Sequence, residues 1–431
     1  MPQSDVFITG IGIISPVGLG RSDYWTGLTT GRSGIRSLIE REDDGAKPTP
    51  DQAQQPFWIG APVTGFDAKQ YVRPRKALKV MCREIQTAFA ASQLAMDDSG
   101  WSDRLPADDD GDVASDRVAT VFGSEMLYGS PNEMIKAVED CRDEDGQIRE
   151  ADFGRSAMKG IMPLWMLKYL PNMPACQIGI AINAQGPNNT LVLGDVSGPA
   201  AVIESMSCLN RGIADLVICG AAGTRINSTR LLYRHDLPAF APESAVTFPC
   251  DPLQCNAGVI GGEGSVAFTL ETADSMAKRD AEPIVRITGI ASRFSPADSM
   301  KQRDRTSKRC ASAGRGSSTA IRNAIDAALS QAGRTESDIG GVVSHAMGDP
   351  SMDAAENDAL KGHLADCPRI EPMRLIGHTG AASGSFAIAT GACWLADAGR
   401  GDGFPGSPDG DVLCLAHTSE GSAVASILSR P

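Results

Sequence analysis

The sequence predicts an α/β fold in which short strands alternate with helices along one continuous chain. Short apolar runs recur between longer segments whose apolar residues lie at helical spacing, as in amphipathic helices. Gly accounts for 46 of the 431 residues, which suits tight turns between strands and helices. No segment rich in Pro, Ser and Gly divides the chain, so we expect a single domain over residues 1–431.

The elements expected near the N-terminus and in the middle of the chain follow from local patterns. Val6–Thr9 is a run of β-branched and aromatic residues, which predicts a strand. Lys76–Leu94 carries apolar residues at helical spacing and predicts a helix. Val196–Asn210 predicts a second helix, and the apolar run Ala214–Cys219 predicts a buried strand.

The rest of the chain continues in the same style and closes on two strands. We expect the domain to consist of two similar halves, about 1–260 and 261–431, although no exact repeat is visible. The strands expected in the second half are Ser265–Leu270, Val285–Ile290, Gly341–Ser344, Val412–Leu415 and Ala423–Leu428, and the helices are Ala320–Ala332 and Gly384–Leu395.

Charge and composition exclude several classes of partner. The formal net charge is −13 and the pI is near 4.9, which argues against a nucleic-acid partner. A basic stretch is interpreted as a solvated helix face, with the docking of an acidic protein as the alternative; it consists of Arg73, Arg75, Lys76, Lys79 and Arg83. The N-terminus lacks a secretory pattern and no apolar run reaches membrane-spanning length, so we expect a cytoplasmic protein whose eleven cysteines are reduced.

Eight sequence blocks occur in an order that matches one enzyme family. They are VFITGIGIISPVG, GRSGI, FDAKQYV, LPNMPACQIGIAINAQGPNNT, RGIADLVICGAAG, GGEGSVAFTLE, GHTGAASG and the closing strand pair. Together they resemble the 3-oxoacyl-acyl-carrier-protein synthases, the elongating condensing enzymes of fatty acid and polyketide synthesis. The resemblance implies a thiolase-like, five-layered α-β-α-β-α fold, a dimer with its pocket near the subunit interface, and no cofactor.

The residue at the family's nucleophile position is Asp195. The family carries a cysteine in a strand-to-helix turn shortly after the GPN block, and here that stretch reads LVLGDVSGPAAV. The nearest cysteines, Cys176 and Cys208, lie well before and well after the turn. A carboxylate is a poor attacker of thioesters, so the usual acyl-enzyme chemistry should be absent. The sequence favours a structural role for Asp195 as a helix N-cap over a carboxylate that points into the pocket.

The family's first histidine block departs partly from its pattern. Here it reads HAMGDPSMDAAE, in which His345 is kept and Asp353 and Glu356 fall where the family has Asp and Glu. Met347 and Asp349 replace two threonines whose hydroxyls hydrogen-bond the phosphopantetheine arm in the family. We expect these two replacements to weaken pantetheine binding, because Met makes no such bond and Asp adds a negative charge.

The second histidine block and the gating positions also differ. His378 is kept in MRLIGHTGAASG, but the family's lysine five residues earlier is Met373. His417 and Ser419 stand where phenylalanines gate the family's pocket, and Val259 replaces another phenylalanine. In the family, the two kept histidines bind the thioester oxygen and promote decarboxylation of malonyl groups.

A metal site is an alternative interpretation of the same residues. The chain has five histidines, of which three fall at family pocket positions. Two histidines and a carboxylate are a metal-ligand set, so Asp195, His345 and His378 would suit one ion if they lay close together. The sequence does not fix these distances, and we expect no metal.

The sequence leaves several functions open. The first is a subunit that resembles a chain-length factor, lacks the acyl-cysteine step and pairs with an active ketosynthase, although such factors typically carry Gln at the nucleophile position. The second is altered chemistry, such as malonyl-thioester decarboxylation with His345 and His378. The third is ordinary 3-oxoacyl synthase activity, and the fourth is hydrolysis through Ser197. Expected partners are a second copy or an active ketosynthase, and an acyl carrier protein.

Overall fold

A computed structural model describes most of the chain, namely residues 5–38, 59–106, 112–129, 132–227, 229, 250–256, 258–297, 315–397 and 404–431. Its main feature is a mixed sheet with the strand order β11-β10-β12-β13-β9-β1-β8-β7-β5-β6. The N-terminal strands are β1 (Val6–Ser15), β5 (Val118–Gly123), β6 (Asn188–Leu191), β7 (Leu216–Thr224) and β8 (Glu263–Thr272). The C-terminal strands are β9 (Val285–Phe294), β10 (Ile339–Val343), β11 (Arg369–Ile370), β12 (Asp411–His417) and β13 (Ser422–Ser429).

The two parts of the sheet have the same topology. When the strands are counted along the chain within each part, both parts have the order 3-2-4-5-1 from the outer edge inward. The parallel and antiparallel pairings also agree, since β5 lies parallel to β6 and β7, and β10 lies parallel to β11 and β12. The match is obtained when the sheet is divided between β8 and β9, that is, after residue 272.

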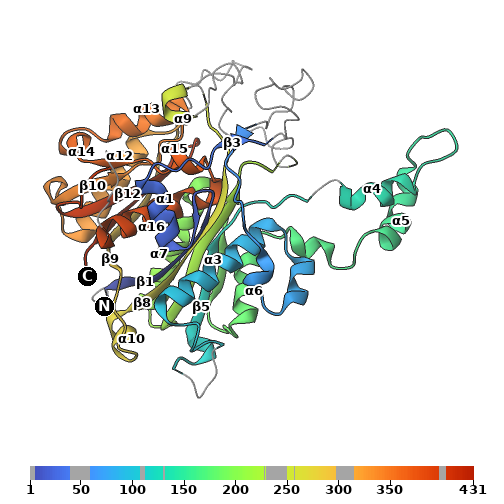
Figure 1. Cartoon of the computed structure of the whole chain (residues 1–431), viewed down its shortest axis with the longest axis horizontal. Coiled ribbons are helices and arrows are strands. Elements are labelled where there is room, and N and C mark those ends of the chain that lie inside the picture. The colour runs from blue at the N-terminus through green and yellow to red at the C-terminus, as the bar shows by residue number, and fades with distance from the viewer. Residues whose placement is uncertain are drawn as a thin grey trace.

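Helices form the other layers of the fold. We call the part of the sheet formed by β1 and β5 to β8 the N-terminal sheet, and the part formed by β9 to β13 the C-terminal sheet. The outer face of the N-terminal sheet is covered by α3 (Arg83–Ser99) and α6 (Met173–Ala181), and the outer face of the C-terminal sheet by α12 (Ser318–Ala332). Between the two sheets lie α7 (Ser197–Asn210) and α16 (Ser383–Ala396). Figure 1 shows this arrangement, which gives the expected five layers of helix, sheet, helix, sheet and helix.

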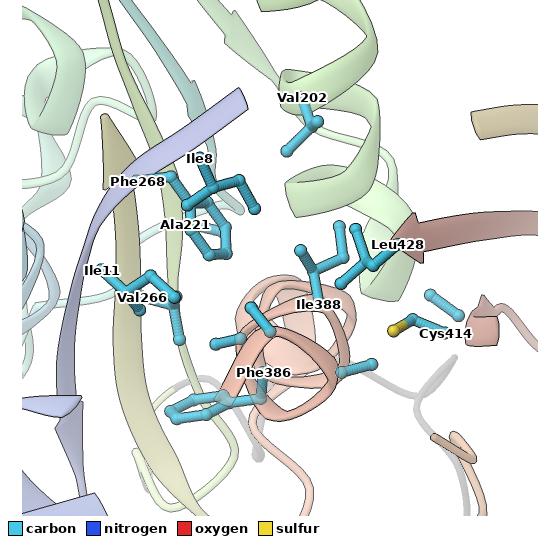
Figure 2. Packing of buried hydrophobic residues seen from close by; sticks show 14 of the residues in the cluster. Ile8, Ile11, Val202, Ala221, Val266, Phe268, Phe386, Ile388, Cys414 and Leu428 are labelled. Carbon is cyan, nitrogen blue, oxygen red and sulfur yellow. The ribbon is translucent and has the colours of Figure 1, made fainter. Parts of the chain in front are cut away.

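The central layer is packed from both sides. Figure 2 shows Val202 of α7 and Phe386 and Ile388 of α16 among strand residues that include Phe268 and Leu428. Every side chain from Ser383 to Leu395 is buried, as expected of a helix that is apolar on all sides. No helix in the described part of the chain is long and apolar enough to cross a membrane.

The remaining described elements are short or peripheral. They are β2 (Gly18–Leu19), β3 (Arg36–Ser37), β4 (Ile59–Gly60), α1 (Arg21–Thr29), α4 (Asn132–Glu139), α5 (Phe153–Gly160), α9 (Pro252–Cys255), α10 (Ala273–Ala277), α13 (Pro350–Ala359), α14 (His363–Asp366) and α15 (Met373–Ile376). In Figure 1, α4 and α5 extend away from the body of the molecule; we refer to residues 126–129 and 132–168 as the arm.

Several expected elements differ in the structure; for example, the strand expected over Ala214–Cys219 is β7, which ends at Thr224. The helix expected over Lys76–Leu94 is a 3₁₀ segment, Arg75–Val80, followed by α3, because the backbone is extended at Met81 and Cys82. The break places the Arg83 guanidinium 2.7 Å from Glu263, so this part of the basic stretch is paired rather than solvated. Strand β1 continues to Ser15, beyond the expected end.

The glycines that interrupt the apolar pattern of β1 make close packing possible. A Cβ at Gly12 would lie 1.8 Å from the carbonyl oxygen of Ala91, so only glycine lets α3 approach β1 this closely.

Candidate functional site

Asp195 lies on the 3₁₀ turn Gly194–Val196, between β6 and α7, and is only 5% exposed. The N-cap interpretation of this residue is wrong, because no side chain caps the start of α7. The Ser197 hydroxyl stabilises the turn instead, since it accepts a hydrogen bond from the Leu193 N–H and donates one to the Gly194 carbonyl. Ser197 is therefore committed to the turn, which argues against its role as a hydrolytic nucleophile.

The Asp195 carboxylate forms two polar contacts inside the protein. Its Oδ2 lies 3.0 Å from Nε2 of His378, and its Oδ1 lies 3.4 Å from Nη2 of Arg225. Burial alone would raise the pKa of Asp195, but the charge and hydrogen bond of His378 and the charge of Arg225 hold it well below its ordinary value. Asp195 is therefore an ionised, buried carboxylate.

Arg225 and Glu125 complete this buried network, and the sequence analysis missed both. Nη1 of Arg225 lies 2.6 Å from Oε2 of Glu125, and Oε1 of Glu125 accepts a hydrogen bond from the Thr224 N–H. Glu125 follows β5 and Arg225 follows β7, which are parallel neighbours. The carboxyl ends of parallel strands meet at the same edge of a sheet, so residues that follow two such strands lie close together. This pattern would have identified Glu125 and Arg225 from the sequence, but the strand β5 had not been predicted.

His345 follows β10 and is fully buried. Its backbone N–H donates a 3.0 Å hydrogen bond to Oε2 of Glu356, while neither ring nitrogen has a hydrogen-bond partner among the described residues. Its ring lies 4.9 Å from that of His417 and 6.2 Å from that of His378, between centroids. Burial, and after it the neighbouring His417, lowers the pKa of His345 to about 3, so the ring is neutral at physiological pH.

His417, at the end of β12, belongs to a second carboxylate–histidine pair. Its Nε2 lies 3.0 Å from Oε2 of Glu356, and the other oxygen of that carboxylate, Oε1, accepts a hydrogen bond from the Ser344 hydroxyl. Burial would raise the pKa of Glu356, but the hydrogen bond and charge of His417 hold it below its ordinary value. His417 is 1% exposed, whereas Ser419, the other expected gating residue, is partly exposed and donates to the Glu420 carboxylate.

The other expected pocket residues divide into apolar and capping side chains. Met347, Val259 and Met373 are each 1% exposed and belong to the main hydrophobic cluster. Asp349 caps α13, because its carboxylate accepts hydrogen bonds from the N–H groups of Ser351 and Met352. The expectation that Asp349 simply adds a charge to the pocket is therefore incomplete, since a helix N-terminus stabilises that charge.

Asp353 and Glu356 support the loop that carries His345. Asp353 accepts hydrogen bonds from the N–H groups of Met347 and Gly348, at 3.0 and 2.8 Å. Despite these bonds, burial raises the pKa of Asp353 to about 6.

The structure brings Asp195, His345 and His378 together. Each offers one ligand atom, and these atoms all lie within 4.8 Å of one another. The three residues come from the turn before α7, the loop after β10 and the segment between α15 and α16. The site is thus built where the N-terminal and C-terminal parts of the fold meet.

Comparison with known proteins decides the family. The model described as "Beta-ketoacyl synthase, N-terminal domain" matches residues 3–275, and the model described as "Beta-ketoacyl synthase, C-terminal domain" matches residues 300–398. The chain belongs to the beta-ketoacyl synthase family. The resemblance inferred from the eight sequence blocks is therefore confirmed, and with it the thiolase-like α/β fold.

Curated relatives come from fatty acid and polyketide biosynthesis. The chain is 30% identical over 300 residues to 3-oxoacyl-[acyl-carrier-protein] synthase 2 of Synechocystis; this match covers 68% of the chain and 63% of that enzyme, less than two thirds of its length. It is 27% identical to the ketoacyl synthase alpha subunit of the tetracenomycin polyketide synthase of Streptomyces glaucescens, over 91% of the chain and 85% of the subunit. The corresponding beta subunit is 26% identical, over 89% of the chain and 84% of the subunit.

Solved structures show the same fold at low sequence identity. The ishigamide ketosynthase/chain length factor superposes with a TM-score of 0.74 at 19% identity, over 100% of both chains. A beta-ketoacyl synthase from Burkholderia phymatum STM815 gives a TM-score of 0.75 at 17% identity, over 99% of this chain and 100% of the other. A type II polyketide synthase ketosynthase, solved in complex with its acyl-carrier protein, gives 0.69 at 17% identity over 100% of both chains.

Proposed function

We propose that this chain is a ketosynthase-like subunit that forms no acyl-enzyme and acts beside an active ketosynthase, in the manner of a chain-length factor. The observation that supports this most directly is the state of Asp195. The family resemblance places the nucleophilic cysteine there, and the structure has an ionised carboxylate held by His378 and Arg225. Such a carboxylate is a poor nucleophile toward a thioester, and an acyl-carboxylate anhydride would be too labile to retain a growing chain.

Exposed apolar side chains support a partner subunit of the same fold. Among the described residues, the exposed large apolar side chains concentrate in the arm, α6 and the end of β6; they include Met158, Leu164, Met166, Ile180 and Leu193. Among the strands of the described residues, β6 is also the outer strand of the N-terminal sheet, and its outer edge pairs with none of the others. Exposed apolar patches of this kind mark protein interfaces.

Similarity to paired subunits favours a ketosynthase as that partner. The chain resembles both the alpha and the beta ketoacyl synthase subunits of one polyketide synthase, and its fold matches a ketosynthase/chain length factor. We infer that this protein pairs with an active ketosynthase in fatty-acid or polyketide-type biosynthesis, where an acyl carrier protein supplies the acyl group. The alternative is a homodimer.

A second candidate function is decarboxylation of a malonyl thioester by His345 and His378. The neutral, buried His345 ring favours it, because neither of its nitrogens has a partner in the described part of the chain and such a ring can stabilise a developing enolate. Two contacts oppose it: His378 is already bound to Asp195, and that carboxylate would repel the malonyl carboxylate. Ordinary 3-oxoacyl synthase activity is a third candidate and would require a nucleophile other than Asp195.

The experiment that separates these functions is intact-protein mass spectrometry with acyl- and malonyl-loaded carrier protein, together with measurement of carbon dioxide release. The native chain should show no acyl adduct and no decarboxylation, while the Asp195→Cys variant serves as the control for carrier docking. An acyl adduct on the native chain would contradict the proposal that it forms no acyl-enzyme. Decarboxylation that is lost in a His345→Gln variant would instead establish the second function.

The partner is tested separately with the tagged native chain, expressed in its own host and purified. We expect it to retain a ketosynthase that carries a cysteine at the position of Asp195. A chain that purifies only as a homodimer would contradict the heterodimer proposal.

A further inference from the structure

The proposed function assigns no ligand to the cluster of Asp195, His345 and His378. We propose that these three side chains form a binding site for one divalent metal ion such as Zn²⁺. The carboxylate of Asp195 and one ring nitrogen from each histidine supply three ligands, which leaves coordination positions for water or a substrate oxygen. This proposal stands whether or not the chain acts as a partner subunit.

The distances suit a single ion. Two ligands that are each about 2.1 Å from one ion lie roughly 3.0 Å apart at neighbouring octahedral positions and about 3.4 Å apart in a tetrahedron. Oδ2 of Asp195 and Nε2 of His378 are 3.0 Å apart. The third ligand atom, from His345, lies within 4.8 Å of the other two, so a small movement of its side chain closes the set.

His345 supplies an independent observation that points to a ligand. It is fully buried, yet both of its ring nitrogens lack a hydrogen-bond partner among the described residues. Buried polar atoms are normally satisfied, so such a ring is an exception that requires an explanation. An ion between His345, His378 and Asp195 would satisfy one of these nitrogens directly.

Hydrogen bonds hold the loop that carries His345 in place. Glu356 fixes the loop that carries His345, since it accepts the His345 backbone N–H and is itself held by His417 and Ser344. These hydrogen bonds fix the backbone from which the His345 ring projects.

Arg225 is the feature that competes with a cation, because its guanidinium lies 3.4 Å from the Asp195 carboxylate. It approaches Oδ1, whereas the proposed ligand is Oδ2, which faces His378. The positive charge of Arg225 is also engaged with Glu125 at 2.6 Å. We therefore expect Arg225 to weaken the site without blocking it.

The test is a titration of the chelator-treated, full-length protein with Zn²⁺, followed by calorimetry and by elemental analysis after gel filtration. We expect one ion per chain. Asp195→Asn and His345→Gln should weaken binding by roughly 100-fold or more, since each removes a ligand. Two variants serve as matched controls. His363→Gln changes a histidine on α14, and Cys255→Ser removes one of the two adjacent free thiols, Cys250 and Cys255. Both controls should bind as the native chain does.

A spectroscopic measurement on the native chain keeps the test decisive if a variant fails to fold. Co²⁺ in place of Zn²⁺ should give visible absorption typical of nitrogen and oxygen ligands, without a thiolate charge-transfer band. A thiolate band would place the ion on cysteines and overturn the proposal. The absence of retained zinc in the native chain, or full binding by folded Asp195→Asn, would overturn it equally.

Discussion

Oδ2 of Asp195 lies 3.0 Å from Nε2 of His378, and this pair joins the two similar parts of the fold. Asp195 precedes α7 in the N-terminal part, and His378 follows α15 in the C-terminal part. Arg225 and Glu125 extend the pair into a buried network. A buried charge is stable only while its partners are present, so the network makes the position of each member depend on the others.

Arg225 should therefore be important for stability. Arg225→Met removes the guanidinium from two buried carboxylates, Glu125 and Asp195, and we expect it to lower the free energy of unfolding by about 3–5 kcal/mol. The measurement is urea unfolding followed by circular dichroism. Arg142→Met is the control, because Arg142 pairs with Glu139 on the exposed arm and its loss should leave the free energy of unfolding almost unchanged. Equal effects of the two changes would contradict the importance of the buried network.

Asp195→Cys should produce a reactive thiol. His378 and Arg225 both contact the carboxylate that the thiol would replace, and a neighbouring arginine or histidine lowers a cysteine pKa. We expect this cysteine to be alkylated by iodoacetamide much faster than Cys219, whose pKa burial raises to about 12. Peptide mapping after short exposure gives the rates.

The His378→Gln version of that variant provides the control. It should react more slowly than the single Asp195→Cys variant, because the imidazole partner is absent. Reaction at the same rate with and without His378 would show that the pair seen in the structure does not activate a nucleophile at this position.

Asp353 predicts a specific pH dependence of stability. Its pKa in the folded protein is raised from 3.8 to about 6, chiefly by burial, so protonation of Asp353 stabilises the fold. This contribution is complete below about pH 4 and is lost as the pH rises through about 6. Between about pH 4 and pH 6, the free energy of unfolding of the native chain should therefore fall relative to that of Asp353→Asn. A constant difference across this range would contradict the raised pKa.

The sequence predicted the fold well because its blocks carry both local and family information. The helix expected over Val196–Asn210 is α7, and that expected over Ala320–Ala332 is α12 with two further residues. The expected end of the first strand at Thr9 was wrong, since Gly10 and Gly12 look like breaks in an apolar pattern. Their role becomes visible only when α3 is seen to pack against them.

The residues of the site were predicted from the sequence, but their arrangement was not. Asp195, His345 and His378 were identified by position, and their proximity required the structure. The cap interpretation of Asp195 failed because the local preference of Asp for helix starts was overridden by two distant partners, His378 and Arg225. Those partners lie 183 and 30 residues away in sequence, so no local pattern reveals them.

The interface prediction concerns Leu193, which is 51% exposed beside the end of β6 and two residues from Asp195. If the proposed partner covers this face, Leu193→Asp places a charge in an apolar interface and should dissociate the dimer. Phe294→Asp is a matched control, because Phe294 is 65% exposed on β9, away from the arm and β6 in sequence and in strand order. Analytical ultracentrifugation gives the mass of each variant.

We expect Leu193→Asp to sediment as a single chain and Phe294→Asp to retain the mass of the native assembly, because a charge on an interface is costly only where water is excluded. Since Leu193 adjoins the turn that carries Asp195, its change should also alter the alkylation rate of the Asp195→Cys variant when the dimer dissociates. If Leu193→Asp leaves both the mass and that rate unchanged, the face around β6 is not the interface, and the site is complete within one chain.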